Sequence, residues 1–183
     1  MTDVLKPPLD INQVSSSATF FRTHLGHREN ATQLAIKLIR RAIQIERIEH
    51  GVNPVVMEFT QIAERWAIGH IVQGCYIEEY HQWEKAVKQY FKAQRELNGL
   101  QDDFDWRSGN KSMIQRARES LMFFSVSIDE AILKGIDSVR ETVNDIKHDP
   151  LVSHVEESNY WSAINSFKSF WEKTMEVEGT SFG

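Results

Sequence analysis

The densest group of potentially reactive side chains lies between residues 138 and 150, in the stretch SVRETVNDIKHDP. Four polar residues occur there at helical intervals: Arg140, Asn144, Lys147 and His148. Residues three or four positions apart share one side of an α-helix, so these side chains are expected to lie together. Histidine can act as a general acid or base near neutral pH, arginine and lysine can hold a phosphate, and asparagine can orient a hydroxyl group or water. The stretch therefore predicts Arg140, Asn144 and His148 as catalytic residues, and Lys147 as a substrate-binding residue.

The helix that must position these residues is indicated by an apolar stripe. The stripe has gaps of three and four residues and consists of Ile128, Ile132, Ile136, Val139, Val143 and Ile146. At about 100° per residue, the four polar residues lie beside this stripe, at the rim of whatever the helix packs against. Asp149-Pro150 ends the helix, because the residue before a proline disfavours the α conformation. The alternative is a purely structural role, in which Lys147 and His148 solvate the helix end and interact with the negative end of its dipole.

The helix end that carries Arg140, Asn144 and Lys147-His148 resembles the closing motif of HEPN-type helical domains. The following segment, NYWSAINSFKSFWEK, is similar to the helices that follow such motifs in bacterial relatives. The resemblance extends over residues 55–175. It implies an all-helical, homodimeric protein without a cofactor, which acts on RNA or a nucleotide as a metal-independent ribonuclease or toxin-type protein.

The interval between Arg140 and His148 is longer than in the family pattern. Eight residues span about 12 Å along a helix, so these two side chains of one chain cannot easily reach the same atom. If two such helices cross antiparallel at a twofold axis, Arg140 of one chain comes near His148 of the other. We therefore expect a homodimer with this helix at or near its interface. Arg65 and His70 come closer to the family interval, but core-like residues surround them.

A metal site is a second chemical hypothesis. Glu78 and His81 have the i, i+3 spacing that di-iron carboxylate bundles use, and Asp145 and His148 repeat the interval with aspartate in place of glutamate. Lone carboxylates from other helices would complete such a site, and the candidates are Glu46 or Glu49, and Glu119. The alternative for the first pair is a solvated helix face that also includes Glu79 and Glu84.

Composition limits the class of protein. The chain has 183 residues, a net charge of −5 and a single cysteine, Cys75. This length suits one domain, and the negative charge argues against non-specific nucleic-acid binding. One cysteine excludes an intrachain disulfide and favours a reducing compartment. No signal-like or membrane-spanning apolar segment is found, so a cytoplasmic protein with no membrane association is expected.

The fold class predicted from the periodicity is all-α, an irregular bundle of about five helices in one domain. We expect an N-terminal arm over residues 1–14, the helical domain over 15–178 and a frayed tail over 179–183. The expected helices are 19–50 with an interruption near Gly26, 55–97 with a bend or break near Gly69 or Gly74, 111–124, a helix from Asp129 to His148, and 158–176. Glycines inside the second of these patterns motivate the expected break, because glycine disfavours a helix interior by about 1 kcal/mol.

A non-enzymatic helical interaction module that binds a protein partner is the competing function. Aromatic residues on more than one side of the last helix, Trp161, Phe170 and Trp171, would then mark a dimer surface. Two further apolar faces are expected to pack in the bundle: Leu34, Leu38, Ile45 and Ile48, widened by Ile36, Ile39 and Ile43, and Phe59, Ile62 and Trp66.

Overall fold

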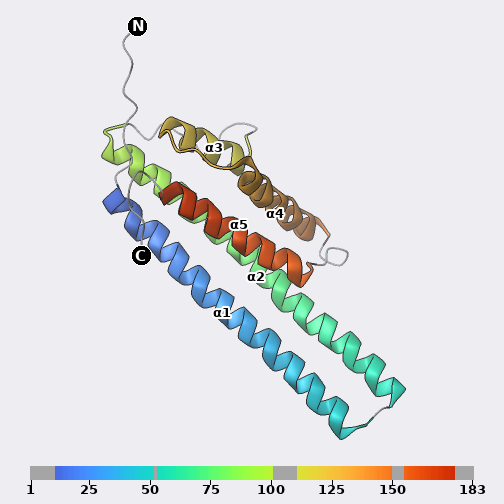
Figure 1. The fold of residues 1–183 in the computed structure, drawn as a ribbon. Coiled ribbons are helices and arrows are strands. Elements are labelled where there is room, and N and C mark those ends of the chain that lie inside the picture. Colours follow the sequence, from blue (N-terminus) through green and yellow to red (C-terminus); the bar gives the residue numbers. More distant parts are fainter. Residues whose placement is uncertain (1–10, 52, 101–110, 150–154, 176–183) are drawn as a thin grey trace.

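The computed structural model describes residues 11–51, 53–100, 111–149 and 155–175, and over these residues it contains helices and no strand. The helices are α1 (Ile11–Glu49), α2 (Pro54–Leu97), α3 (Met113–Phe123), α4 (Glu130–His148) and α5 (Glu157–Met175). The prediction of an all-α bundle is confirmed (Figure 1). Because α1 begins at Ile11, residues 11–14 belong to a helix and not to the expected arm. Residues 1–10 and the expected tail lie outside the described part of the chain.

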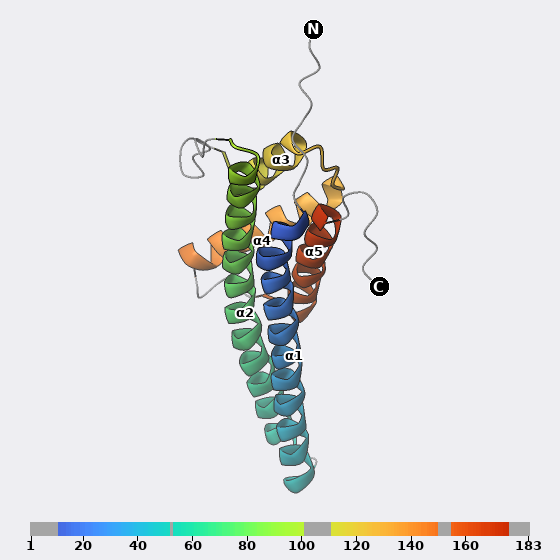
Figure 2. The same cartoon turned by 90° about the vertical axis from the view of Figure 1, so that its left-hand side faces the viewer.

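Two long antiparallel helices, α1 and α2, form a hairpin that runs the length of the molecule (Figures 1 and 2). The turn between them has the residues that its backbone requires. Gly51 has φ of 63°, a conformation that a residue without Cβ adopts at little cost after a helix end. Asn53 then caps α2 by accepting a hydrogen bond from Val55 N, and Pro54 occupies the first turn, where no backbone donor is needed.

Both helices of the hairpin are continuous, so the expected interruptions near Gly26 and near Gly69 or Gly74 are wrong. A glycine weakens a helix by roughly 1 kcal/mol, which tertiary packing readily outweighs. α1 and α2 pack against one another along their length, and buried side chains on both sides of these glycines oppose a break. Leu25 and Val72 are among them and have no exposed surface.

The remaining helices cover only one half of the hairpin. α4 and α5 each have 19 residues, whereas α1 has 39 and α2 has 44. At 1.5 Å per residue, a helix of about 28 Å cannot cover one of about 60 Å. Figures 1 and 2 accordingly show the turn end of the hairpin projecting past the other helices. The Arg40–Glu157 ion pair, 2.6 Å long, joins the first residue of α5 to α1, and the part of the hairpin between this ion pair and the turn is called the free end here.

An aromatic cluster joins α2 to α5 in the covered half. The Trp83 ring lies edge-on to Phe170 at 5.2 Å between centroids and is stacked with Phe167 at 5.9 Å. Trp171 meets Tyr90 edge-on at 5.5 Å. Phe170 and Trp171 are fully buried, so these side chains form part of the core and the expectation that they mark a dimer surface is wrong.

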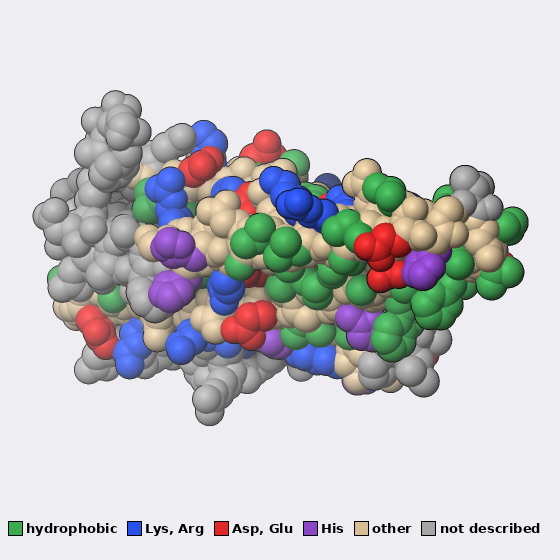
Figure 3. Space-filling view, turned by 90° about the horizontal axis from the view of Figure 1, so that it is seen from below, with side chains coloured by type: hydrophobic (Ala, Val, Ile, Leu, Met, Phe, Trp, Pro, Cys, Tyr) green, Lys and Arg blue, Asp and Glu red, His purple; other side chains and the backbone are tan. Residues whose placement is uncertain are grey.

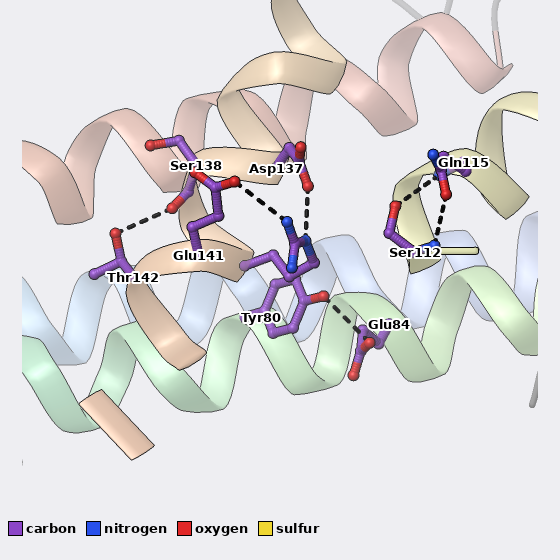
Figure 4. A network of polar contacts seen from close by, with 9 residues as sticks. Tyr80, Glu84, Ser112, Gln115, Asp137, Ser138, Glu141 and Thr142 are labelled. Carbon is purple, nitrogen blue, oxygen red and sulfur yellow. Dashed lines mark hydrogen bonds and ion pairs between the residues drawn. The ribbon is translucent and has the colours of Figure 1, made fainter. Parts of the chain in front are cut away.

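The shorter helices begin where the sequence provides caps. Ser112 and Gln115 form a reciprocal capping box at the start of α3, drawn on the right of Figure 4. Asp129 accepts a hydrogen bond from Ala131 N at the start of α4, as predicted. α4 then buries Leu133, Ile136, Val139, Val143 and Ile146 and ends at His148. Both ends of this helix and the stripe from Ile136 to Ile146 therefore follow the sequence prediction, whereas Ile128 and Ile132 are only partly buried and Leu133 lies in the core instead.

α4 and α5 approach one another closely at Gly135. A Cβ atom built at this position would lie 2.6 Å from Ser166 Oγ, whereas one built at Gly74 would meet no atom within 4 Å. Glycine is therefore required for packing at the first position and only weakens the helix at the second.

The two glycines give a matched pair of stability predictions. Gly74→Ala should raise the free energy of unfolding by about 0.5–1 kcal/mol, because alanine favours the helix and nothing obstructs it. Gly135→Ala should give no such gain and should destabilise the protein, because the Ser166 hydroxyl must move. Chemical denaturation of both variants tests this, with Gly135→Ala/Ser166→Ala as the control that removes the clash. Equal effects at both positions would contradict the close approach.

Candidate functional site

The four polar residues predicted to form a site lie on the second half of α4. Lys147 and His148 are exposed in its last turn, while Asn144 and Arg140 are partly buried further back along the helix. Three pockets in the described structure, of about 280, 350 and 600 Å³, are lined by other residues. Arg140, Asn144, Lys147 and His148 therefore lie along one helix surface and do not line any of these pockets.

Arg140 is held by carboxylates of its own helix. Its Nε donates a hydrogen bond to Asp137 Oδ1 at 2.7 Å, and a terminal nitrogen donates to Glu141 Oε1 at 3.4 Å (Figure 4). The hydrogen bond that it donates to Asp137 raises the pKa of the guanidinium, so its charge is firmly retained. Across from α4, the Tyr80 hydroxyl donates to Glu84 Oε1 at 3.2 Å, and burial raises the pKa of this phenol. A phosphate bound by Arg140 would have to compete with two carboxylates.

The residues of the metal hypothesis are not assembled into a site. Within the described ranges, no group of three or more histidine, cysteine, aspartate or glutamate side chains could hold a metal ion. Glu78 accepts a hydrogen bond from Gln82 at 2.8 Å, and His81 lies 3.5 Å from Glu84, so both have partners on α2 itself. Asp145 and His148 do not join them.

Two of the three carboxylates considered as further ligands are also engaged locally. Glu119 pairs with Lys111 at 2.7 Å, and Glu46 lies 3.3 Å from His50, the first residue after α1. Both contacts lie at the surface, where such pairs contribute little to stability and leave the side chains solvated.

The second arginine–histidine pair, Arg65 and His70, does not converge. The His70 ring packs on Trp66 at 4.1 Å between centroids, and its Nδ1 is 2.9 Å from Trp66 O. Arg65 instead lines the 280 Å³ pocket together with Arg40 and Glu157. Five positions along a helix correspond to a rotation of about 140°, which accounts for the separation.

A buried ion pair between the long helices was missed from the sequence. Glu79, predicted to lie on a solvated face, is only 1 % exposed, and its Oε2 accepts a hydrogen bond from Arg28 at 2.7 Å. The other carboxylate oxygen has no partner among the described residues. Burial raises the pKa of Glu79 to about 7, although the nearby Arg28 charge lowers it and Glu78 and Glu29 add smaller upward shifts. Glu79 occupies the stripe of Val72, Tyr76 and Trp83, a spacing that could have identified it.

The raised pKa of Glu79 gives a pH dependence of stability. The folded state binds the proton of the Glu79 carboxyl group more tightly than the unfolded state does. The resulting contribution to the free energy of unfolding is therefore fully present below the ordinary glutamate pKa. It is lost as the pH rises through about 7. Between pH 5 and pH 8, the free energy of unfolding of the wild type should fall by up to about 3 kcal/mol relative to that of Glu79→Gln, whose side chain cannot titrate. Chemical denaturation at both pH values measures this, with the exposed Glu78→Gln as control. A Glu79→Gln variant with the pH slope of the wild type would contradict the assignment.

The hairpin also carries eight large apolar side chains whose exposure reaches 46–73 %. On α1, four of them form one row with Arg41 at its centre, and successive residues of the row are four, three, four and three positions apart. This row, called the α1 seam, consists of Leu34, Leu38, Arg41, Ile45 and Ile48. On α2 they follow the intervals four, three and four as Val55, Phe59, Ile62 and Trp66, called the α2 seam. Figure 3 shows hydrophobic side chains concentrated toward its right-hand end, where the hairpin turn lies.

The sequence placed the apolar residues of the seams other than Val55 on core-facing sides of the helices, and for these residues that expectation is wrong. On α1 the core side is formed by Ile36, with the partly buried Ile39 and Ile43, and the α1 seam lies about 180° away from it. Leu38 is 57 % exposed and Trp66 is 69 % exposed. The intervals of three and four residues are those of coiled-coil core positions, which contact another helix. The seams are therefore the second candidate site of the chain.

No protein-family model, curated protein or solved structure matches the chain at a significant level. None of the described helices combines the length and the apolar character needed to cross a bilayer. Function is therefore interpreted from the geometry of the chain itself.

Proposed function

We propose that the chain is a helical protein-interaction module and that its binding surface consists of the α1 and α2 seams. The observation that carries this proposal is the exposure of eight large apolar side chains on one hairpin. Together they present on the order of 1,000 Å² of apolar surface, divided between the two seams, so each seam alone is comparable to the largest apolar patch of a typical monomer, roughly 300–600 Å². Burying such a surface against a partner releases ordered water and is strongly favourable.

The spacing of the seams identifies the kind of partner. Rows of apolar residues at alternating intervals of three and four accept the knobs of a facing α-helix. An amphipathic helix that lies along a seam fits this geometry, with its own apolar anchors at similar intervals. The Arg41 side chain in the α1 seam favours a partner with a carboxylate at the facing position, because an unpaired charge in an interface is costly.

Photo-crosslinking tests this proposal. A photoreactive amino acid is placed at Leu38 or Ile62 of the full chain, or at Glu141, a 65 % exposed position on α4 that serves as control. In cells that naturally produce the protein, we expect protein adducts from positions 38 and 62 and little from 141. Because both seam positions are exposed, the unfolding free energy should change by no more than about 0.5 kcal/mol. Absence of adducts at both seams, or equal yields at all three positions, would refute the proposal.

A metal-independent ribonuclease of HEPN type is the second candidate function. What supports it is the exposure of Lys147 and His148 side by side at the end of α4, where a polyanion can reach them. His148 could transfer a proton, and Lys147 could hold a phosphate. Asn144 would orient the attacking hydroxyl, and Arg140 would have to leave Asp137 to stabilise the developing charge.

An RNA-cleavage assay tests the second candidate. His148→Ala should abolish cleavage and Arg140→Ala should reduce it by a factor of about 10–1,000, the range expected when a proton-transfer group or a charge-stabilising donor is lost. Lys134→Ala, at an exposed position on the same helix, should cleave at the wild-type rate. A wild-type protein that cleaves no RNA would eliminate this function and leave the interaction module unaffected.

A further inference from the structure

We infer that the α2 seam binds the α2 seam of a second copy of this chain, with the two helices antiparallel. The inference deepens the proposed function and rests on it, because it names the partner of one of the two seams. It assigns a homodimer interface to Val55, Phe59, Ile62 and Trp66, and not to α4.

The intervals of the α2 seam suit self-association. The intervals of four, three and four residues are the same when counted from either end of the seam, so an antiparallel copy presents the same spacing of apolar side chains. A twofold axis between residues 60 and 61 places Phe59 opposite Ile62 of the partner, and Val55 opposite Trp66 of the partner. Each of these contacts pairs an aromatic with an aliphatic side chain. Rows that combine large and smaller residues interdigitate without voids or overlaps.

Charges beside the seam are complementary in the same arrangement. Glu58 and Arg65 flank the seam on one side, and neither pairs with any other residue within the described part of the chain. In the antiparallel pair, residue 56 of one copy lies opposite Arg65 of the other. Glu58 is two residues from that position, which corresponds to about 3 Å along the helix axis. The twofold axis generates this ion pair twice. The other side of the seam carries the apolar Val56 and Ala63, so no like charges meet there.

The α1 seam does not suit self-association in this way. Antiparallel pairing of two α1 seams places Arg41 in the row of apolar contacts of each copy. A buried arginine without a carboxylate costs more than the burial of the neighbouring apolar groups gains. A second copy therefore binds the α2 seam. The α1 seam remains available to a partner that places a carboxylate side chain opposite Arg41.

The area of the interface sets the expected affinity. Four side chains of this size that expose 58–73 % of their surface present on the order of 600 Å² per chain, or about 1,200 Å² per dimer. That is the lower limit for specific interfaces, so a dissociation constant of about 1–100 µM is expected.

Sedimentation velocity of the full chain between about 1 µM and about 500 µM tests the inference. The wild type should change from monomer to dimer across this range. Ile62→Glu should weaken dimerisation at least about 10-fold, because it places two charges beside the axis. Leu38→Glu, the matched change in the α1 seam, should leave it unchanged. Circular dichroism confirms that each variant remains folded.

The charge pair provides an independent arm of the experiment. Glu58→Arg alone and Arg65→Glu alone should each weaken the dimer, because like charges then face one another twice. The double variant should recover most of the wild-type affinity. A wild type that is monomeric at all concentrations would overturn the inference, as would equal weakening by Leu38→Glu or a double variant that does not recover. Protein adducts from position 38 in cells would in that case still support the interaction module.

Discussion

The contact of Trp83 with Phe167 and Phe170 is the interaction on which the arrangement of the helices depends. The three rings are fully buried and connect the middle of α2 to α5. Aromatic side chains bury large apolar areas, and they pair with defined edge and offset geometries, so this contact fixes both the distance and the angle between the helices. α4 then packs on α5 where Gly135 allows the close approach. α5 has only 19 residues, and the position of this contact therefore decides which half of the hairpin is covered.

Much of the fold was predictable from the sequence because local signals and burial agree there. The α4 region shows this most clearly: an aspartate cap, one apolar stripe and an Asp-Pro stop specify a helix between Asp129 and His148. Helix continuity was not predictable in the same way. Gly26 and Gly74 favour a break by a small local free energy, whereas the contacts that oppose the break come from residues far away in the sequence.

The location of the candidate sites was harder to predict. α1 has apolar residues on two opposite sides, and periodicity cannot tell which side meets another helix. That choice depends on how far α5 reaches. The pairing of Arg140 with Asp137 is a local contact at i, i+3, but the sequence leaves open whether the arginine points to it or to a ligand. For Glu79 the signal was present, since it falls on the buried stripe of α2.

The free end also has a consequence for the cooperativity of folding. Between Arg40 and the turn, the two helices contact one another through partly buried side chains and through Arg47, which lies 3.1 Å from Thr60 and 3.3 Å from Glu64. Segments with few buried contacts open at a lower free energy than the globally unfolding core. Amide hydrogens near the turn therefore exchange with solvent first, and protection increases along both helices toward the aromatic contact. The tip of the hairpin is thus expected to open at a lower free energy than its base, although no residue within either helix interrupts the backbone.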